Sequence, residues 1–594
     1  LAPTATNMTN SDGKVHRTEM DYPEEFSGLV YREMEYRNML FPIRQRSFVD
    51  NVQLDGSWTQ YNLFNNHPYP QYFRRYERTW DQLGLLMPGQ WELQGTVFGY
   101  DRGNPTSVQM DGWNREYYTW TNSGLIDQRR YEDFTWDYEY HPETNLVSSI
   151  TDIDGQVVFH DYDVLGRLSE SRARSGNVRT SYEYQYQNGS GRNYVKSRTD
   201  YTPVTGSNLQ WMESWQYLDG LGRPMQTVQR QHSPDQKDVI TAVEYDNQGR
   251  VSKEYVPYES AHDDGRFVAI PANQKHSSVQ YEASPLNRTT SSTPPSWYAT
   301  TSSYGTNGAG EVMNLQTNTF YAAKELLKTT VTDPNGNQTI GYKDKLGRDV
   351  MSNRTSGFAS ESAKTYFLYD DKSRLRTVVP PKATLSSTDL IYEYVYDGAD
   401  NVLEKKIPGQ SVLKMLYDRR NLVTFSQDGN QAAQSQWLHS KYDVYGRPIS
   451  TGFYVGSAPN PVAQYGYSTQ LSQTTYDGSS PINKGKIYFH QNKVLGSSDW
   501  IKTIYYYDQY GRNYASSGNN ALNQSMGKET AQTQFDFADN VLSHTRRHYD
   551  GSNALTKITT RADYDHKGRL SNNYHQINNE PEVRLANHVY NHRD

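Results

Sequence analysis

The sequence contains no cysteine among its 594 residues. Disulfide scaffolds, cysteine-ligated zinc, iron–sulfur clusters and thiol catalysis all need a sulfhydryl group, so each of them is excluded. This absence leaves the compartment open, because a secreted protein can also do without cysteine. The chain begins at Leu1 rather than at a methionine, and we expect either that its start has been removed or that it is a piece of a longer product.

Apolar residues are also scarce. They make up 35% of the chain, and the mean hydropathy is −0.91, which approaches the range of disordered proteins. Aromatic residues nevertheless make up 13%, including 50 Tyr, and disordered chains are poor in aromatics. We therefore predict a folded, polar, tyrosine-rich chain. No apolar run approaches the roughly 18 residues that span a bilayer, so no membrane span is expected.

Neither sign of charge dominates. The chain has 60 Lys and Arg against 67 Asp and Glu, for a net charge of −7. Without a basic stripe, nucleic acid is not an expected partner. A chain of this length ordinarily forms several domains, unless repeats provide one continuous core.

A six-residue pattern, Tyr-Asp-x-x-Gly-Arg, recurs along the chain. Its five full copies are Tyr162-Asp163-Val164-Leu165-Gly166-Arg167, Tyr245-Asp246-Asn247-Gln248-Gly249-Arg250, Tyr442-Asp443-Val444-Tyr445-Gly446-Arg447, Tyr507-Asp508-Gln509-Tyr510-Gly511-Arg512 and Tyr564-Asp565-His566-Lys567-Gly568-Arg569. Six diverged copies keep the Asp, and they begin at Leu218 (with Asp219, Gly222 and Arg223), Lys343, Tyr369, Tyr396, Tyr417 and Phe535.

The substitutions within the pattern indicate what each position does. An Asp at the start of a turn accepts hydrogen bonds from the backbone N–H groups ahead of it. A Gly three residues later can take the positive φ that closes a hairpin with a bulge. Where the Gly is lost, Asn, Asp or Ser replaces it, and Asn and Asp are the next most tolerant residues at positive φ.

The segments around these turns alternate polar with aromatic or β-branched residues, as in 180–186 and 390–396. This period of two predicts strands, so the chain is expected to be all-β. We divide it into an N-terminal β region with diverged repeats (1–135) and a repeat region (136–594). A Ser/Thr/Pro-rich stretch near 284–310 is expected to be a long exposed loop.

Other segments give weaker signals. Residues 31–36, 69–76 and 116–120 look strand-like because they are rich in aromatics. A short helix is expected at 321–327, where alanines and leucines follow one another. The repeats and turn signatures elsewhere leave little room for other helices.

The Tyr-Asp-x-x-Gly-Arg units resemble the YD repeats of the Rhs family, whose relatives include the shell-forming components of insecticidal toxin complexes and the teneurins. The resemblance covers nearly the whole chain and is clearest from about residue 137 to 570. It implies a long sheet of β-hairpins wound spirally into a hollow, barrel-like shell. In relatives, this shell encloses a C-terminal toxin until delivery, so an enclosed toxin or a partner subunit outside this chain is the implied partner.

One part of the family pattern is missing. Relatives that process their cargo carry a segment rich in Asp-Pro-x-Gly after the last repeats, and this sequence has none. The chain is therefore expected to be either a fragment or a wall without a toxin. Units of about 25 residues would give roughly 48 strands and a sheet roughly 230 Å wide, little more than one turn of a cylinder about 60 Å across. We expect an open spiral, completed by further chain, a second copy or a partner, or a solid fibre if the tube is much narrower.

No catalytic, cofactor or metal site is predicted. The sequence has no nucleophile elbow, phosphate loop, dinucleotide fingerprint or zinc-protease motif. His544 and His548 would lie ~13 Å apart on a strand, too far for joint ligation of a metal. Asp152 and Asp154, like Asp333 and Asn335, resemble the start of a calcium loop but lack its later Glu, and turn chemistry is the simpler explanation of both.

Three readings of function remain. The leading hypothesis is a non-catalytic structural shell of a secreted or surface-delivered Rhs-type protein of the polymorphic-toxin kind, with self-association as a way to complete it. The alternative is an extracellular adhesion or fibre protein whose rigid β surface contacts glycans or proteins. An enzyme acting on polysaccharide is the third, and the sequence nominates no residues for it.

Overall fold

The computed structural model describes residues 4–11, 13–77, 90–173, 179–186, 192–201, 210–356, 362–478, 483–520, 527–536, 539–549 and 555–591. The chain forms two compact units, and each unit combines separate segments of sequence. Unit 1 contains 1–124, 130–132 and 300–470. Unit 2 contains 125–129, 133–299 and 471–594.

The elements in the described part of unit 1 are almost all strands, with two short helices and one 3₁₀ turn. Its first segment contains β1 (Ala5–Thr9), β2 (Val15–Asp21), η1 (Pro23–Glu25), α1 (Leu29–Tyr36), β3 (Arg44–Val49), β4 (Val52–Phe64), β5 (His67–Glu77), β6 (Gln90–Asp101), β7 (Asn104–Met110) and β8 (Glu116–Trp120). Its later segment contains β23 (Thr300–Thr306), β24 (Met313–Asn314), β25 (Thr319–Phe320), β26 (Leu327–Thr332), β27 (Gln338–Lys343), β28 (Asp349–Thr355), β29 (Ser362–Tyr369), β30 (Leu375–Val379), β31 (Tyr392–Tyr396), β32 (Val402–Lys406), β33 (Leu413–Tyr417), β34 (Val423–Gln427), α2 (Gly429–Ala433), β35 (Gln436–Tyr442) and β36 (Pro448–Val455).

The described part of unit 2 consists of strands and their connections. Two strands, β9 (Ile126–Tyr131) and β37 (Thr469–Tyr476), are divided between the residue ranges of the units. The first segment contains β10 (Phe134–Tyr140), β11 (Val147–Thr151), β12 (Val157–Tyr162), β13 (Leu168–Ala173), β14 (Arg179–Gln185), β15 (Asn193–Tyr201), β16 (Gln210–Leu218), β17 (Pro224–Gln229), β18 (Val239–Tyr245), β19 (Val251–Tyr255), β20 (Tyr258–Glu259), β21 (His276–Tyr281) and β22 (Thr289–Thr293). The later segment contains β38 (Ile487–Lys493), β39 (Trp500–Tyr507), β40 (Asn513–Gly518), β41 (Glu529–Phe535), β42 (Val541–Tyr549), β43 (Leu555–Tyr564), β44 (Leu570–Ile577) and β45 (Val583–Asn587).

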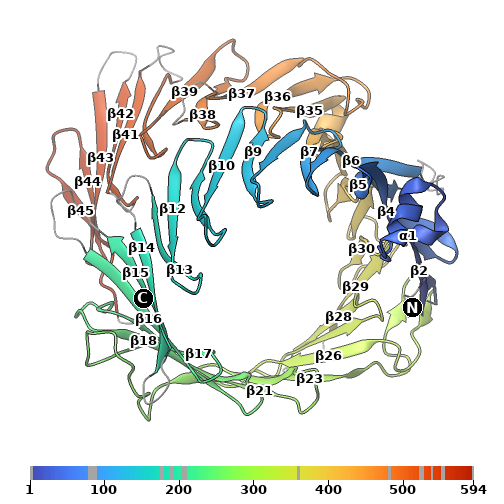
Figure 1. Cartoon of the computed structure of the whole chain (residues 1–594), viewed down its shortest axis with the longest axis horizontal. Coiled ribbons are helices and arrows are strands. Elements are labelled where there is room, and N and C mark those ends of the chain that lie inside the picture. Colours follow the sequence, from blue (N-terminus) through green and yellow to red (C-terminus); the bar gives the residue numbers. More distant parts are fainter. Residues whose placement is uncertain are drawn as a thin grey trace. The chain divides into compact units, whose positions relative to one another are not determined.

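The printed strand pairs are antiparallel, and most of them join strands that are consecutive in the chain, as Figure 1 shows. The exceptions are the pairs β18–β20, β19–β21 and β23–β26. At the repeat hairpins the register shifts by one residue beside the Tyr of the pattern. In the β12–β13 pair, for example, Asp161 lies opposite Glu170 but Tyr162 lies opposite Leu168. This shift is a β-bulge, which strengthens the local twist and accommodates the turn. The predicted all-β fold of hairpin repeats is confirmed.

The apolar cores are small and local. In unit 1 a core cluster joins Val312, Leu326, Tyr342, Val350 and Met351. In unit 2 a second cluster joins Trp215, Tyr217, Val228, Ile240 and Tyr258. A chain with few apolar residues cannot build a thick core, so much of the order must come from polar contacts.

Three expectations about local structure were wrong. Residues 31–36 belong to helix α1, because Met34 is completely buried on one face and Glu33 pairs with Arg37 one turn later. Residues 321–327 form no helix, since Lys324 takes a φ of 67° and the chain turns there. The stretch 284–310 contains strands β22 and β23, because its threonines are β-branched and favour strands.

The other two strand-like segments of the N-terminal region were placed correctly. Residues 69–76 lie in β5 and residues 116–120 form β8. The division of the chain at residue 135, which follows how clearly the repeat can be recognised, stays a prediction.

Candidate functional site

The repeat turns form a polar arrangement that recurs along the described chain. In the turn at Asp163, the Asp163 N–H donates to the Arg167 carbonyl at 2.9 Å, and the Gly166 N–H donates to the Asp163 carbonyl at 2.9 Å. The Asp163 Oδ1 accepts from the N–H groups of Leu165 (2.9 Å) and Arg167 (3.0 Å). Its Oδ2 accepts from the Arg167 Nε at 2.7 Å. One carboxylate therefore organises the whole turn.

This geometry recurs along the chain. An Nε to Oδ2 bond of 2.7 to 2.8 Å joins Asp219 to Arg223, Asp246 to Arg250, Asp344 to Arg348, Asp370 to Arg374, Asp443 to Arg447, Asp508 to Arg512 and Asp565 to Arg569. Where Arg is lost, the amides of Asn401 and Asn540 donate to Asp397 and Asp536 at 2.9 Å. The amide takes over one of the two bonds that Arg makes.

The residue before the Arg position takes a positive φ in every described copy. The glycines of the pattern have φ values from 73° to 83°, at Gly166, Gly222, Gly249, Gly347, Gly446, Gly511 and Gly568. Their replacements Ser373, Asp400, Asn421 and Asp539 have values of 66°, 70°, 61° and 66°. The expected exchange of Gly for residues that tolerate positive φ is therefore visible in the backbone.

In six copies the Tyr of the pattern connects its turn to the preceding one, at Tyr245, Tyr396, Tyr417, Tyr442, Tyr507 and Tyr564. The Tyr245 hydroxyl donates to the Pro224 carbonyl at 2.6 Å, and the Arg223 guanidinium lies over the Tyr245 ring, 4.2 Å from its centroid. Hydroxyl bonds of the same kind are made by Tyr184, Tyr281, Tyr396, Tyr417, Tyr442, Tyr507, Tyr564 and Tyr590. A Tyr ring in this position satisfies a carbonyl and covers a cation at once.

Some arginines also reach forward to the next turn. The Arg374 Nη1 donates to the Asp397 carbonyl at 2.7 Å and to the Asp400 Oδ1 at 2.9 Å. The Arg512 Nη1 makes the same two bonds to Asp536 and Asp539, at 2.8 and 2.9 Å. We call this succession of turns, joined by Arg and Tyr side chains, the turn ladder.

Within unit 1, the turns of the later segment contact the earlier segment. Lys14 forms an ion pair with Asp371, and Arg75 forms one with Asp400. The Tyr131 hydroxyl donates to the Val444 carbonyl at 2.7 Å. These contacts join residues more than 300 positions apart in the sequence, so the turns hold two segments of the chain together.

Unit 2 has equivalent contacts. Lys486 pairs with Asp154 at 2.9 Å. The Lys567 ammonium donates to the Arg230 carbonyl at 2.8 Å, and the His566 Nε2 lies 2.9 Å from the Gln231 carbonyl. In this unit too, variable residues inside the repeat turns make the contact between segments.

The environment of the turns shifts several ionisation equilibria. The side chain of Arg167 holds the pKa of Asp163 below its usual value. The backbone N–H groups of Arg223 and Arg250 do the same for the pKa of Asp219 and Asp246. The turns at Asp163, Asp219 and Asp246 thus favour an ionised carboxylate, because the charged form accepts the bonds from Arg and the backbone.

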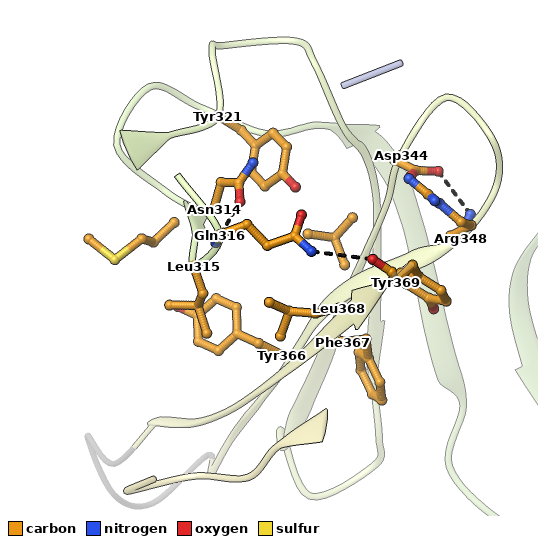
Figure 2. A pocket seen from close by; sticks show the side chains of 12 residues that line it. Asn314, Leu315, Gln316, Tyr321, Asp344, Arg348, Tyr366, Phe367, Leu368 and Tyr369 are labelled. Carbon is orange, nitrogen blue, oxygen red and sulfur yellow. Dashed lines mark hydrogen bonds and ion pairs between the residues drawn. The ribbon is translucent and has the colours of Figure 1, made fainter. Parts of the chain in front are cut away.

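A small pocket of unit 1 lies beside one of these turns. Figure 2 shows Asp344 and Arg348 at one side, and the Gln316 Nε2 donating to the Tyr369 carbonyl at 3.3 Å. The cavity volume is about 30 Å³, enough for one water molecule. This space suits a structural water bridge better than a substrate.

The residues considered above as candidate metal ligands make separate hydrogen bonds and do not converge on one point. The His544 Nδ1 lies 2.9 Å from the Thr533 hydroxyl, whereas His548 bonds to Glu529. The Asp152 Oδ1 accepts from the N–H groups of Asp154 and Gln156 at 3.0 and 2.8 Å. Among the described residues, no group of three or more His, Asp or Glu side chains is placed to hold a metal ion.

Two diverged turns escaped the sequence pattern. Glu282 replaces the Asp and accepts from Arg288 at 2.7 Å across a turn that is two residues longer. In the other, the Gly485 N–H donates to the Asp477 carbonyl at 2.8 Å, and Gly485 has a φ of 81°. A search that allows longer spacings between the two halves of the pattern finds both turns. The first reads Tyr-Glu followed by Asn-Arg, and the second reads Tyr-Asp followed by Gly-Lys.

The part of the chain that the structure describes contains no helix long and apolar enough to cross a bilayer.

Comparisons with known proteins give a likeness in fold. A domain of unknown function, DUF6443, matches residues 190–309, and no curated protein matches the sequence. The crystal structure of TcdB2-TccC3-Cdc42 is similar with a TM-score of 0.72 at 13% identity, over 98% of this chain and 36% of that chain. The Tc holotoxin pore of Photorhabdus luminescens is similar with a TM-score of 0.70 at 12% identity, over 98% and 35%. The chain therefore shares the fold of these toxin-complex structures and spans about a third of their chains.

Proposed function

We propose that the chain is a non-catalytic structural wall of an Rhs-type shell protein that is secreted or delivered to a cell surface. The turn ladder is the main support for this proposal, because the same side-chain contacts recur from turn to turn and join one turn to the next. The likeness to toxin-complex structures over nearly the whole chain supports it. The partner is then an enclosed toxin or a partner subunit outside this chain.

The physical requirement of such a wall is rigidity in a thin sheet. A single polar sheet cannot rely on a deep core, and each charge-assisted hydrogen bond to a carbonyl or carboxylate contributes about 1.5–3 kcal/mol. A ladder that repeats these bonds at successive turns distributes stability along the sheet, as in other repeat proteins. The arrangement explains an ordered chain with only 35% apolar residues.

Protease protection of an enclosed polypeptide tests the proposal. The polypeptide is isolated from its source without denaturant and digested with trypsin, and the fragments are identified by mass spectrometry. We expect an accompanying polypeptide to resist cleavage until guanidinium chloride unfolds the wall. A partner cleaved equally fast in both conditions, or the absence of any accompanying polypeptide, would contradict enclosure.

The adhesion alternative has one observation in its favour. Trp297 and Tyr298 are 67% and 74% exposed and lie against each other with ring centroids 6.1 Å apart. Exposed rings of this kind can stack on sugars. Binding of the chain to an array of immobilised glycans, abolished by Trp297→Ala, would favour adhesion over enclosure.

A further inference from the structure

A large groove in unit 1 lies beside the repeat turn at Asp418. Its volume is about 990 Å³, at the upper end of the range for ligand sites in proteins. The turn after β33, strands β34 and β35, the start of β36 and the loop 456–468 that follows β36 line it. Gly112 of the earlier segment closes one side, where its backbone meets that of Arg419.

The loop 456–468 is held over the sheet by aromatic contacts. The Tyr465 ring packs edge-on against Phe425 with centroids 5.6 Å apart. The Tyr467 ring packs against His439 at 5.2 Å, and it lies where a side chain at Gly452 would have to be. Gly452 lies directly opposite His439 in the β35–β36 pair. The groove is therefore formed by a specific fit, in which a glycine makes room for a ring.

His439 is an unusual part of the lining. It is only 4% exposed and stacks on Phe425, with centroids 4.2 Å apart. Its Nδ1 has no hydrogen-bond partner among the described residues. Burial, with the nearby charge of Lys441, lowers the pKa of His439 to about 4. The ring is thus neutral at physiological pH, and an unpaired polar atom remains in the groove lining.

The charge of the lining is positive. Arg419, Arg420 and Lys441 line the groove, and Asp418 is its one carboxylate. Arg420 forms an ion pair with Asp418 at 2.9 Å and donates a hydrogen bond to the Asp443 carbonyl at 2.6 Å. Lys441 lies over the Tyr467 ring at 4.5 Å, and neither it nor Arg419 has a carboxylate within ion-pair distance in the described structure.

Apolar surface lies between these cations. Ile449, Pro461, Val462 and Tyr465 also line the groove. A ligand that complements this surface has carboxylates at intervals and apolar side chains between them. An extended acidic peptide has this chemistry, since its side chains alternate in direction along the backbone.

We propose that the groove is a docking site for an extended acidic peptide, whose carboxylates bind Arg419 and Lys441 while its apolar side chains contact Pro461, Val462 and Tyr465. This inference does not rest on the enclosure proposal. It gives the chain a specific peptide-binding function in addition to a structural one.

Calorimetric titration of the full 594-residue chain tests the proposal. The probe is the acetylated and amidated heptapeptide ELEFELE, and the peptide KLKFKLK is its charge-reversed control. We expect saturable binding of the acidic peptide only, weakening as NaCl is raised from 50 to 300 mM because salt screens the charges. The double variant R419Q/K441Q should bind about tenfold more weakly.

Two further variants distinguish binding from folding. K441R keeps the cation over Tyr467 and should retain the wild-type affinity. K405Q removes an exposed lysine of β32 outside the groove and should leave affinity unchanged. Equal thermal unfolding of all variants shows that the fold is intact.

Three results would overturn the proposal. The first is that ELEFELE does not bind, and the second is that it binds equally to wild type and to R419Q/K441Q. The third is that an anionic polysaccharide such as chondroitin sulfate displaces the peptide at a concentration below that of the peptide itself. The last result would assign the groove to a glycan.

Discussion

Arg374 offers the sharpest test of the turn ladder. Its side chain is 11% exposed and bonds to Asp370 within its own turn. It also bonds to the carbonyl of Asp397 and the carboxylate of Asp400 in the next turn, and it lies over the Tyr396 ring at 4.7 Å. Replacing it with Met keeps much of the stem but removes every one of these bonds.

The expected cost is about 2–3 kcal/mol of local stability. A hydrogen bond to a charged group contributes about 1.5–3 kcal/mol, and a stacked cation adds about 0.5–1 kcal/mol. In Arg374→Met, the Asp370 carboxylate still accepts a hydrogen bond from the N–H of residue 374, and Asp400 still pairs with Arg75. These remaining contacts partly offset the loss. Arg374→Lys should lie between wild type and Met, because an ammonium cannot make the forked contact.

Hydrogen exchange followed by mass spectrometry measures this effect locally, which suits a long repeat chain without a single unfolding transition. Peptides covering β29 to β32 should exchange roughly 30- to 160-fold faster in Arg374→Met. Arg376→Met, an exposed arginine two residues later on β30, is the matched control and should change exchange little. If both variants behave alike, Arg374 does not join the two turns and the reasoning fails.

Three other changes follow from the same geometry. Gly446→Val should destabilise unit 1 by about 2 kcal/mol or more, because φ is 78° and a Cβ would lie 2.8 Å from the Trp113 ring. Gly347 has a similar φ of 80° but open space around it, so Gly347→Val should cost only about 1–2 kcal/mol. Equal thermal shifts of the two variants would show that the Trp113 side chain moves aside and adds no cost. Asp219 has a lowered pKa in the folded chain, so its contribution to stability is present above its unfolded pKa of about 3.9 and is lost as pH falls through the folded value. Thermal unfolding scans from pH 3 to 7 should therefore show that the stability of Asp219→Asn depends less on acid than that of the wild type. An unchanged pH profile would contradict the role of Asp219. Burial, with the charges of Arg569 and Lys567, lowers the pKa of His232 to about 4, so stability is full above pH 6.5 and declines as pH falls towards 4; His232→Gln should lose less stability than wild type between pH 7 and pH 5 in the same scans.

Much of the fold was predictable because the repeat turn is a local device. Asp163 satisfies N–H groups two and four residues ahead, so the sequence within six residues contains the information. The same holds for Asp400 and Asn421, where the tolerance of a single residue for positive φ decides what replaces Gly.

The features that escaped prediction depend on residues far apart in sequence. The contacts of Arg374 with Asp397 and Asp400 require the next hairpin to be in place. The aromatic residues of 31–36 favour a strand, whereas the segment forms helix α1 with Met34 buried, and that burial depends on what packs against the helix. The groove beside His439 depends on how loop 456–468 folds back over Gly452, and no local pattern in that loop specifies this.

Electron cryomicroscopy of the native polypeptide, isolated from its source with whatever accompanies it, tests the central claim most directly. The proposed function predicts polypeptide density that does not belong to the wall and that is enclosed by it. A wall whose faces are bare of foreign density, in a preparation that binds glycans through its surface, would contradict the shell function and favour adhesion.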